Sequence, residues 1–342
     1  MERSRFRVAV VGAGVAGLSA AGRLLDAGLD VRVFEKSRGL GGRLAVRRQD
    51  GIGSFDLGAQ FMTAESVAFR QVLAEASSRG LVAPWEGRLV HISAHGTESA
   101  RSRTRYVGVP GMNAWVKSMV KQEFVNLGHQ VAQVRQEADG RWSLDGARDS
   151  FFDAVVLAIP APQAQALLGT KIPLADETSL LLAQETMEPC WCVYAAFDDR
   201  VDLPFDGAFV RDPGLPFSWI ARDSSKPGRS ATRDHWVLHA SPAWSRQHFD
   251  VDPKTVTDIL LTALASLAGK ALPPAAHVGS HRWRYAAPIG QALSGPQWSG
   301  SQRIGVVGDW VSGGRVEGAY LAGVSMADAI LDWWQKTCYR TL

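Results

Sequence analysis

The stretch FRVAVVGAGVAGLSAAGRLLDAGLDVRVFE, residues 6–35, determines the fold of the N-terminal region. An apolar run over Phe6–Val11 predicts a strand, and the apolar spacing across residues 18–25 predicts a helix. A second apolar run, Val31–Phe34, predicts the next strand. The segment is therefore a strand–helix–strand unit that opens a doubly wound α/β fold.

The turn between the first strand and the helix is rich in glycine. Gly12 permits the tight turn, Gly14 lets the backbone approach a diphosphate, and Gly17 permits close packing of helix on strand. The positive end of the helix dipole then favours the charge of the diphosphate. Glu35, at the end of the second strand, can accept hydrogen bonds from the ribose hydroxyls of an adenosine. The unit predicts a dinucleotide site.

Two further segments decide which dinucleotide is bound. GLGGR, residues 39–43, is a second glycine turn ending in an arginine, for which an NAD enzyme has no need. Gly308-Asp309-Trp310 ends a strand and precedes a helix starting near Glu317, whose dipole would stabilise negative charge on a reduced flavin. In this order, the three segments resemble the cofactor site of the flavin amine oxidase superfamily, and the resemblance implies FAD. A second GxGxxG and a C-x-x-C dithiol are both absent from the sequence, so we expect an oxidase or a simple dehydrogenase.

Composition excludes several other classes of protein. The chain has 342 residues, 46% of them hydrophobic, and a net charge of +3, too small and scattered for nucleic-acid binding. None of its segments reaches the ~18 apolar residues of a membrane helix. Cys190, Cys192 and Cys338 are too few for a disulfide framework and lack further ligands for a metal. We expect a cytoplasmic protein without a metal, with Cys190 and Cys192 as small buried residues on one face of a strand.

Motifs spread over nearly the whole chain resemble bacterial renalases, within the flavin amine oxidase superfamily. They are DLGAQF (56–61), RYVG (105–108), PGM (110–112), WVLHAS (236–241), WSRQ (244–247), HRWRY (281–285) and residues 308–323. The resemblance implies a Rossmann-type FAD-binding domain with a smaller substrate domain. It also implies oxidation of dihydro isomers of NAD(P)H (2- or 6-dihydro-NAD(P)), with O2 reoxidising the flavin to give H2O2 and NAD(P)+.

The resemblance also implies an extended FAD site. Noncovalent binding is expected, because no His or Cys for attachment stands beside Gly42 or Asp309. The cofactor residues are Gly12, Ala13, Gly14, Val15, Ala16, Gly17, Glu35, Lys36, Gly42, Arg43, Gly58, Ala59, Gln60, Val131, Gly308, Asp309, Val316 and Glu317.

A second group of residues is expected to contact the substrate. Arg315 stands where amine oxidases of the superfamily carry a tyrosine, and a guanidinium would repel a protonated amine but pair with a phosphate or carboxamide. Arg105 is the candidate for the substrate phosphates, or else a solvated strand charge. The full group comprises His239, Tyr285 and Arg315 as catalytic residues and Gln60, Phe61, Thr63, Arg105 and Trp283 as substrate-binding residues.

Several interpretations stay open at this level. His239 could be a strand histidine bonded within the protein, and Tyr285 or Trp283 could be core aromatics. Asp223 departs from the renalase pattern, which has an Asn near this position. If Asp223 faced the flavin, its carboxylate would disfavour negative charge on the flavin. The alternatives to a dihydronicotinamide oxidase are an amine or related CH–NH oxidase and a flavin-binding scaffold or sensor without turnover.

The predicted organisation is α/β (α+β overall), because nucleotide-binding segments at both ends enclose longer alternating strands. The FAD-binding domain is expected over residues 1–62, 105–166 and 286–342, and the mixed-sheet substrate domain over 63–104 and 167–285. Later helices are predicted over 64–79, 112–126, 173–183, 253–268 and 317–335, and later strands over 88–92, 129–135, 141–144, 154–159, 191–197, 217–222, 235–240 and 303–307.

Overall fold

The computed structural model describes residues 6–145, 147, 151–169, 187–289 and 295–338. The chain divides into two compact units, which we call the Rossmann unit and the inserted unit. The Rossmann unit comprises Met1–Gly42, Val116–Met187 and Ala287–Leu342, and the inserted unit comprises Arg43–Trp115 and Glu188–Ala286.

The Rossmann unit is built on a sheet with the order β19-β20-β13-β1-β2-β9. Every pairing in it is parallel except that of β19 with β20. The central strands are buried, as their continuous apolar sequences require. The predicted α/β Rossmann-type fold is thus confirmed. The strands are β1 (Arg7–Val11), β2 (Asp30–Glu35), β9 (Val125–Leu127), β13 (Ala154–Leu157), β19 (Gln297–Ser299) and β20 (Ile304–Val306).

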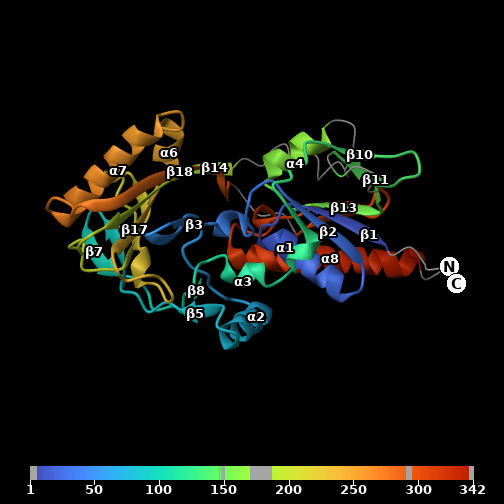
Figure 1. The fold of residues 1–342 in the computed structure, drawn as a ribbon, viewed down its shortest axis with the longest axis horizontal. Coiled ribbons are helices and arrows are strands. Elements are labelled where there is room, and N and C mark those ends of the chain that lie inside the picture. The colour runs from blue at the N-terminus through green and yellow to red at the C-terminus, as the bar shows by residue number, and fades with distance from the viewer. Residues whose placement is uncertain (1–5, 146, 148–150, 170–186, 290–294, 339–342) are drawn as a thin grey trace. The chain divides into compact units, whose positions relative to one another are not determined.

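Helices α1 (Val15–Asp26) and α8 (Val316–Cys338) lie side by side in this unit (Figure 1). Ser19 Oγ donates to the carbonyl of Tyr320 at 3.1 Å. A Cβ on Gly323 would lie 2.0 Å from Ser19 Oγ and 2.2 Å from the carbonyl oxygen of Ala16. Only glycine at position 323 therefore allows the two helices this approach.

One predicted helix in the Rossmann unit is wrong in most of its length. The pattern over residues 112–126 predicts a helix, but only α3 (Ala114–Lys117) and the 3-10 turn Gln122–Phe124 are helical. Val125–Leu127 instead pairs with β2, because sheet pairing outweighs a local helical pattern. The prediction for 173–183 lies outside the described residues. The remaining elements are α4 (Ala161–Leu168), β10 (Val134–Gln136), β11 (Trp142–Leu144) and β12 (Phe151–Phe152).

The inserted unit contains a second sheet, with the order β18-β14-β17-β16-β15-β6-β7. The strand predicted over 217–222 and the helix predicted over 253–268 are confirmed at the same bounds. The strands are β6 (Leu89–Ser93), β7 (Gly96–Ser99), β14 (Met187–Phe197), β15 (Gly207–Val210), β16 (Phe217–Arg222), β17 (Asp234–Ala240) and β18 (Ala275–Pro288).

The two faces of this sheet are covered differently. Helices α6 (Pro242–Gln247) and α7 (Pro253–Ala268) lie over one face (Figure 1), where Leu260 and Leu264 of α7 join the core of alternate strand residues. On the other face, Phe55 and Leu57 pack with strand residues including Cys192, Tyr194 and Val237. Around them lie β3 (Val46–Gln49), β4 (Gly53–Asp56), α2 (Val67–Ser78), β5 (Val82–Pro84) and β8 (Tyr106–Gly108).

The boundary between the units differs from the predicted domain boundary. We predicted residues 1–62 and 105–166 for the FAD-binding domain, but 43–62 and 105–115 belong to the compact inserted unit. The reason is packing: Phe55 and Leu57 are buried against the strands of the inserted unit. The chain therefore passes from the Rossmann unit to the inserted unit within the glycine turn at 39–43.

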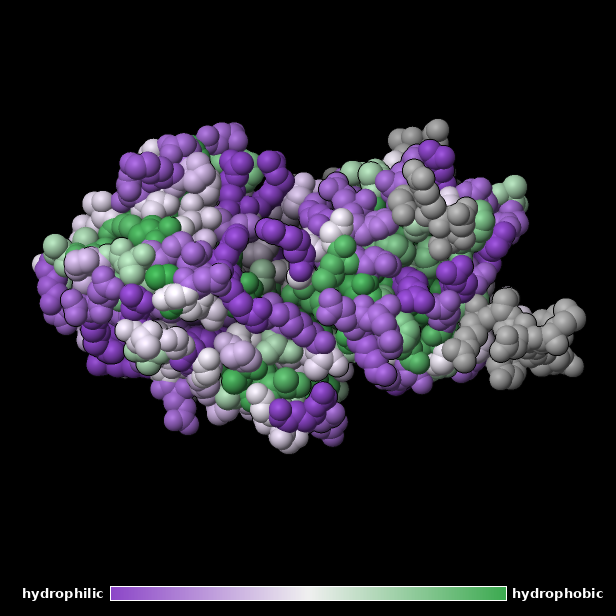
Figure 2. All heavy atoms as spheres, in the orientation of Figure 1, coloured by the Kyte–Doolittle hydropathy of each residue, from purple (hydrophilic) through white to green (hydrophobic). Residues whose placement is uncertain are grey.

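The visible surface is mostly hydrophilic, with smaller hydrophobic areas between (Figure 2). Large exposed hydrophobic side chains in the described part, such as Val67 and Ile259, belong to separate elements. Among the described residues, none of the helices combines the length and apolar character that crossing a membrane requires.

Candidate FAD site and candidate substrate site

The turn that joins β1 to α1 brings bare backbone to the N-terminus of α1. Gly12 has φ +105°, and a Cβ there would lie 2.5 Å from the carbonyl of Ala158. A Cβ on Gly17 would lie 2.0 Å from the Gly12 carbonyl. A Cβ on Gly14, the residue before α1, would have no other heavy atom within 4 Å. This turn is tightly packed on the protein side and open at Gly14, which fits a diphosphate at a helix N-terminus.

Glu35 is buried at the end of β2 and supports the same turn. Its Oε2 accepts from the Ala13 N–H at 2.8 Å, and its Oε1 accepts from the Ser37 N–H at 2.8 Å and from the Ser37 hydroxyl. A carboxylate has about four lone-pair sites, so capacity for ribose hydroxyls remains. Ser37 was not predicted, because a serine after an acidic residue carries no distinctive sequence signal. Lys36 is exposed.

The second glycine turn packs on the first. The Gly41 N–H donates to the Ala13 carbonyl at 2.8 Å, and a Cβ on Gly42 would lie 3.3 Å from the Gly14 Cα. Gly42 also has φ +53°, which glycine adopts readily. Arg43 begins the inserted unit, where its guanidinium donates to the Ala286 carbonyl at 3.1 Å.

The C-terminal motif forms a compact turn before α8. The backbone N–H groups of Ser312 and Gly314 both donate to the Asp309 carbonyl at 2.9 Å. Asp309 and Glu317 are buried, and Arg315 is exposed immediately before α8. The helix begins at Val316, so its N-terminus lies where the sequence predicted. Val131, another predicted cofactor residue, is buried in the Rossmann unit.

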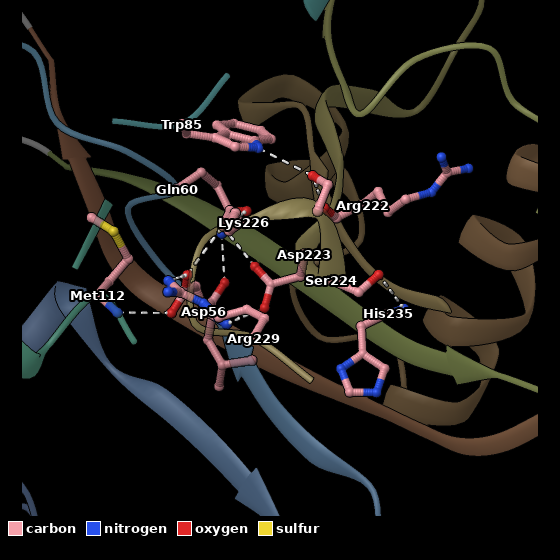
Figure 3. Close-up of polar contacts among 12 residues, drawn as sticks. Asp56, Gln60, Trp85, Met112, Arg222, Asp223, Ser224, Lys226, Arg229 and His235 are labelled. Atoms are coloured by element: carbon pink, nitrogen blue, oxygen red, sulfur yellow. Dashed lines mark hydrogen bonds and ion pairs between the residues drawn. The ribbon is translucent and has the colours of Figure 1, made fainter. Parts of the chain in front are cut away.

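A buried cluster of charged residues, absent from the sequence predictions, lies in the inserted unit (Figure 3). We call Asp56, Gln60, Asp223, Lys226 and Arg229 the buried charge cluster. The Lys226 ammonium contacts Asp223 Oδ1 at 2.6 Å, Gln60 Oε1 at 3.0 Å and Asp56 Oδ2 at 3.1 Å. Its three N–H donors therefore all have acceptors.

The two carboxylates of the cluster differ in environment. Asp56 also accepts from Arg229 Nη2 at 2.5 Å and from the Met112 N–H at 3.0 Å. Burial raises the pKa of Asp56, but Lys226 and Arg229 together outweigh it and hold that pKa below its usual value. Burial raises the pKa of Asp223 above its usual value, against the opposing effect of Lys226. Asp223 thus has an internal ion-pair partner.

The segment after Asp56 is held by hydrogen bonds at every residue. The Leu57 carbonyl accepts from His239 Nε2 at 2.9 Å and from Trp283 Nε1 at 3.1 Å. A Cβ on Gly58 would lie 2.0 Å from the Arg43 carbonyl, which also accepts from the Ala59 N–H at 2.9 Å.

Gln60 ends this segment. Its Nε2 donates to the carbonyls of Asp56 and Gly58 at 2.5 and 3.0 Å. Because Lys226 uses its Oε1, both ends of the amide serve the protein's own structure.

His239 is a neutral imidazole in this environment. Burial lowers its pKa to about 4, with the Leu57 hydrogen bond opposing and Lys226 reinforcing the shift. Since Nε2 donates to Leu57, the proton resides on Nε2 and Nδ1 is an acceptor. His239 and Trp283, two predicted site residues, therefore meet at one carbonyl.

Phe61 and Arg105 also come together. The Arg105 guanidinium lies 5.5 Å from the ring centroid of Phe61 and 5.6 Å from that of Phe209. Its hydrogen bond is to the Arg103 carbonyl, and no carboxylate among the described residues pairs with it. Burial and the neighbouring Arg103 lower the pKa of Arg105. Thr63 and Tyr285 are partly exposed in the same unit.

The fold and the glycine turns define a Rossmann-type dinucleotide-binding protein. A family model described as "Flavin containing amine oxidoreductase" matches residues 77–331, and one described as "NAD(P)-binding Rossmann-like domain" matches residues 10–76. The chain belongs to the flavin-containing amine oxidoreductase family. It is an FAD-dependent oxidoreductase, and the predicted cofactor is confirmed.

Individual proteins share a short stretch of sequence or the fold with this chain. Over 52 residues the chain is 56% identical to zeta-carotene-forming phytoene desaturase of Myxococcus xanthus, a match spanning 15% of this chain and 10% of that protein. A putative protoporphyrinogen oxidase from Exiguobacterium sp. 255-15 has a TM-score of 0.75 at 15% identity, and putrescine oxidase bound to putrescine has 0.74 at 16%. Each alignment covers 96% of this chain and 99% of the other, and shows the fold alone.

Proposed function

We propose that this protein is a renalase-like oxidase that takes hydride from dihydro isomers of NAD(P)H, 2- or 6-dihydro-NAD(P). When bound, noncovalently as we expect, FAD would supply a two-electron acceptor, N5, for the substrate hydride, and its reoxidation by O2 with one proton from solvent would give H2O2 beside the product NAD(P)+. The chain's own task is then to bind and orient a neutral ring that carries anionic phosphates.

The observation that carries this proposal is the environment of Arg105. This guanidinium lies over Phe61 and Phe209 and lacks a carboxylate partner among the described residues. Asp56 and Asp223, two buried carboxylates of the same unit, are already paired with Lys226 and Arg229. An uncompensated cation beside aromatic rings attracts a phosphate and repels a protonated amine. For Arg315, which is exposed before α8 in the Rossmann unit, we propose the role predicted from the sequence, pairing with a phosphate or carboxamide.

His239 suits the uncharged end of such a substrate. Its Nε2–H is held by the Leu57 carbonyl, so Nδ1 can accept a hydrogen bond from a carboxamide N–H. With a pKa of about 4 the imidazole adds no positive charge near neutral pH. We propose His239, Tyr285 and Trp283 as ring-positioning residues and Arg105 as the phosphate ligand.

Oxidation of a small amine is the second candidate, because the family is named for that chemistry and putrescine oxidase shares the fold. An amine would have to bind uncharged, since Arg105 disfavours its ammonium form.

Anaerobic reduction of the bound flavin separates the candidates. We expect 2- or 6-dihydro-NAD(P) to bleach the flavin absorbance rapidly, and admission of air to release one H2O2 per NAD(P)+ formed. Putrescine and benzylamine serve as comparison substrates. Bleaching by an amine alone would overturn the proposal, and no bleaching by either class would favour a flavin-binding protein without turnover.

A further inference from the structure

Aromatic side chains stand in register across four neighbouring strands of the sheet of the inserted unit. Strand register pairs His91 of β6 with Phe209 of β15, Phe209 with Trp219 of β16, and Trp219 with His239 of β17. Residues paired in register point to the same face of a sheet. We call His91, Phe209, Trp219 and His239 the ring row.

Ring contacts confirm that the row is continuous at its distal end. The His91 and Phe209 rings stack with centroids 5.1 Å apart and planes 28° apart. The Phe209 and Trp219 centroids are 4.6 Å apart. The row lies on the face opposite α7, because the alternate residues Ile220 and Leu238 belong to the core that α7 covers. At about 4.8 Å per strand, it runs about 14 Å from His239 to His91.

Polar atoms along the row lack partners. Trp219 is only 7% exposed, yet its Nε1 has no hydrogen-bond partner among the described residues. The same is true of His91 Nδ1 and Arg105 Nε. A buried polar nitrogen without a partner costs about 1–3 kcal/mol, and a ligand that supplied partners to these three nitrogens would remove that cost.

We propose that the ring row and Arg105 bind the adenine nucleotide half of the substrate, which makes the protein selective for a dinucleotide. This rests on the proposed function, in which His239 positions the redox-active ring. Starting from His239, the row presents its binding groups in the order in which a dinucleotide carries its redox-active ring, its diphosphate and its adenine. Arg105 lies over Phe209, midway along the row, where the diphosphate would lie, and the stacked rings of His91 and Phe209 follow as a platform for adenine.

The first test compares two substrates on the FAD-loaded wild-type protein. One is 6-dihydro-NAD and the other is 6-dihydronicotinamide mononucleotide, which has the same reacting ring but lacks the adenylate. We expect kcat/KM for flavin reduction to be at least about 10-fold higher for the dinucleotide, the effect of one stacked base. Equal values would overturn the inference while leaving the proposed function intact.

Single substitutions test whether the ring row causes the preference for the dinucleotide. Phe209→Leu should lower kcat/KM about 10-fold for the dinucleotide, through KM, and leave the mononucleotide nearly unchanged, because the mononucleotide has no base to stack. Phe249→Leu is the matched control, because Phe249 lies under Arg282 and Arg284 (4.6 and 4.8 Å) but outside the ring row. Equal losses on both substrates would indicate a structural role and contradict the inference. If Phe209→Leu lowers Tm strongly, the comparison of the two substrates on the wild-type protein still decides.

Direct binding separates this inference from the proposed function. ADP-ribose carries the adenylate without the redox ring, so isothermal titration calorimetry reports on the row alone. We expect binding to the wild-type protein that Arg105→Met weakens about 10-fold. Such binding without flavin reduction by any dihydro isomer would refute the proposed function and retain the nucleotide site. Absence of ADP-ribose binding at millimolar concentration would refute the site.

Discussion

The two units hold their buried carboxylates in different ways. In the Rossmann unit, the Glu35 carboxylate accepts hydrogen bonds from the N–H groups of Ala13 and Ser37, which lie in or directly after one strand–helix–strand segment. In the inserted unit, Asp56 is neutralised by Lys226 and Arg229, which lie 170 and 173 positions away in the sequence. The first arrangement forms when a local segment folds. The second requires two distant parts of the chain to meet, and it buries two cations and two anions together.

Removing one charge of the cluster should have the largest effect. Lys226→Met leaves Asp56 and Asp223 buried with Arg229 as their only cation, and loss of one partner of a buried pair costs about 3–5 kcal/mol. Urea unfolding should show this loss.

Lys254→Met is the control, since Lys254 forms only an exposed pair with Asp258 and should change little. Lys226→Met combined with Asp223→Leu should recover part of the loss, because the surplus negative charge is removed with its partner. No recovery would show that the cost arises from packing and not from charge.

Substitutions at Gly17 and Gly14 test two separate roles of glycine, close packing within the protein and close approach of a ligand. Gly17→Ala places a methyl 2.0 Å from the Gly12 carbonyl, so we expect a loss of about 1–3 kcal/mol in stability together with loss of FAD. Gly14→Ala meets no described atom within 4 Å and should fold normally, yet weaken FAD at least about 10-fold if the diphosphate lies against it. Flavin content after gel filtration and apoprotein Tm measure the two effects. Full flavin occupancy in Gly14→Ala would contradict this location for the diphosphate.

A smaller effect concerns pH. The pKa of His239 is about 4 in the folded protein and about 6.5 in the unfolded chain, so the unfolded state binds more protons between these values. The contribution of neutral His239 is complete above pH 6.5 and is lost as pH falls toward 4. Relative to His239→Gln, wild-type stability should fall by an additional ~2 kcal/mol between pH 7 and pH 5.

Urea midpoints across this range test the expectation. A slope should remain in the variant, because burial also lowers the pKa of His235 and His281. Identical slopes in both proteins would contradict the assignment to His239.

The same contrast explains what could be predicted from the sequence. Gly12, Gly17 and Glu35 act within one segment, so their spacing identified the dinucleotide site and the fold around it. Lys226 and Asp223 had no such signal, because their partner Asp56 is remote in the sequence. Gln60 shows the consequence: the motif resemblance predicted a ligand contact, but it gave no sign that the side-chain amide bonds Lys226 and the backbone. The pairing of β9 with β2 likewise overrode the local pattern that predicted a long helix.

The contact between α1 and α8 can form only after α8 has been translated. Gly323 and Tyr320 cover Ser19 and Ala16, yet α1 leaves the ribosome first and α8 after all other described elements. Both segments of the inserted unit are translated before α8, so that unit can complete its sheet while α1 still lacks its neighbour. We therefore expect stable retention of the flavin only after α8 has emerged, and nascent chains stalled before α8 should be colourless.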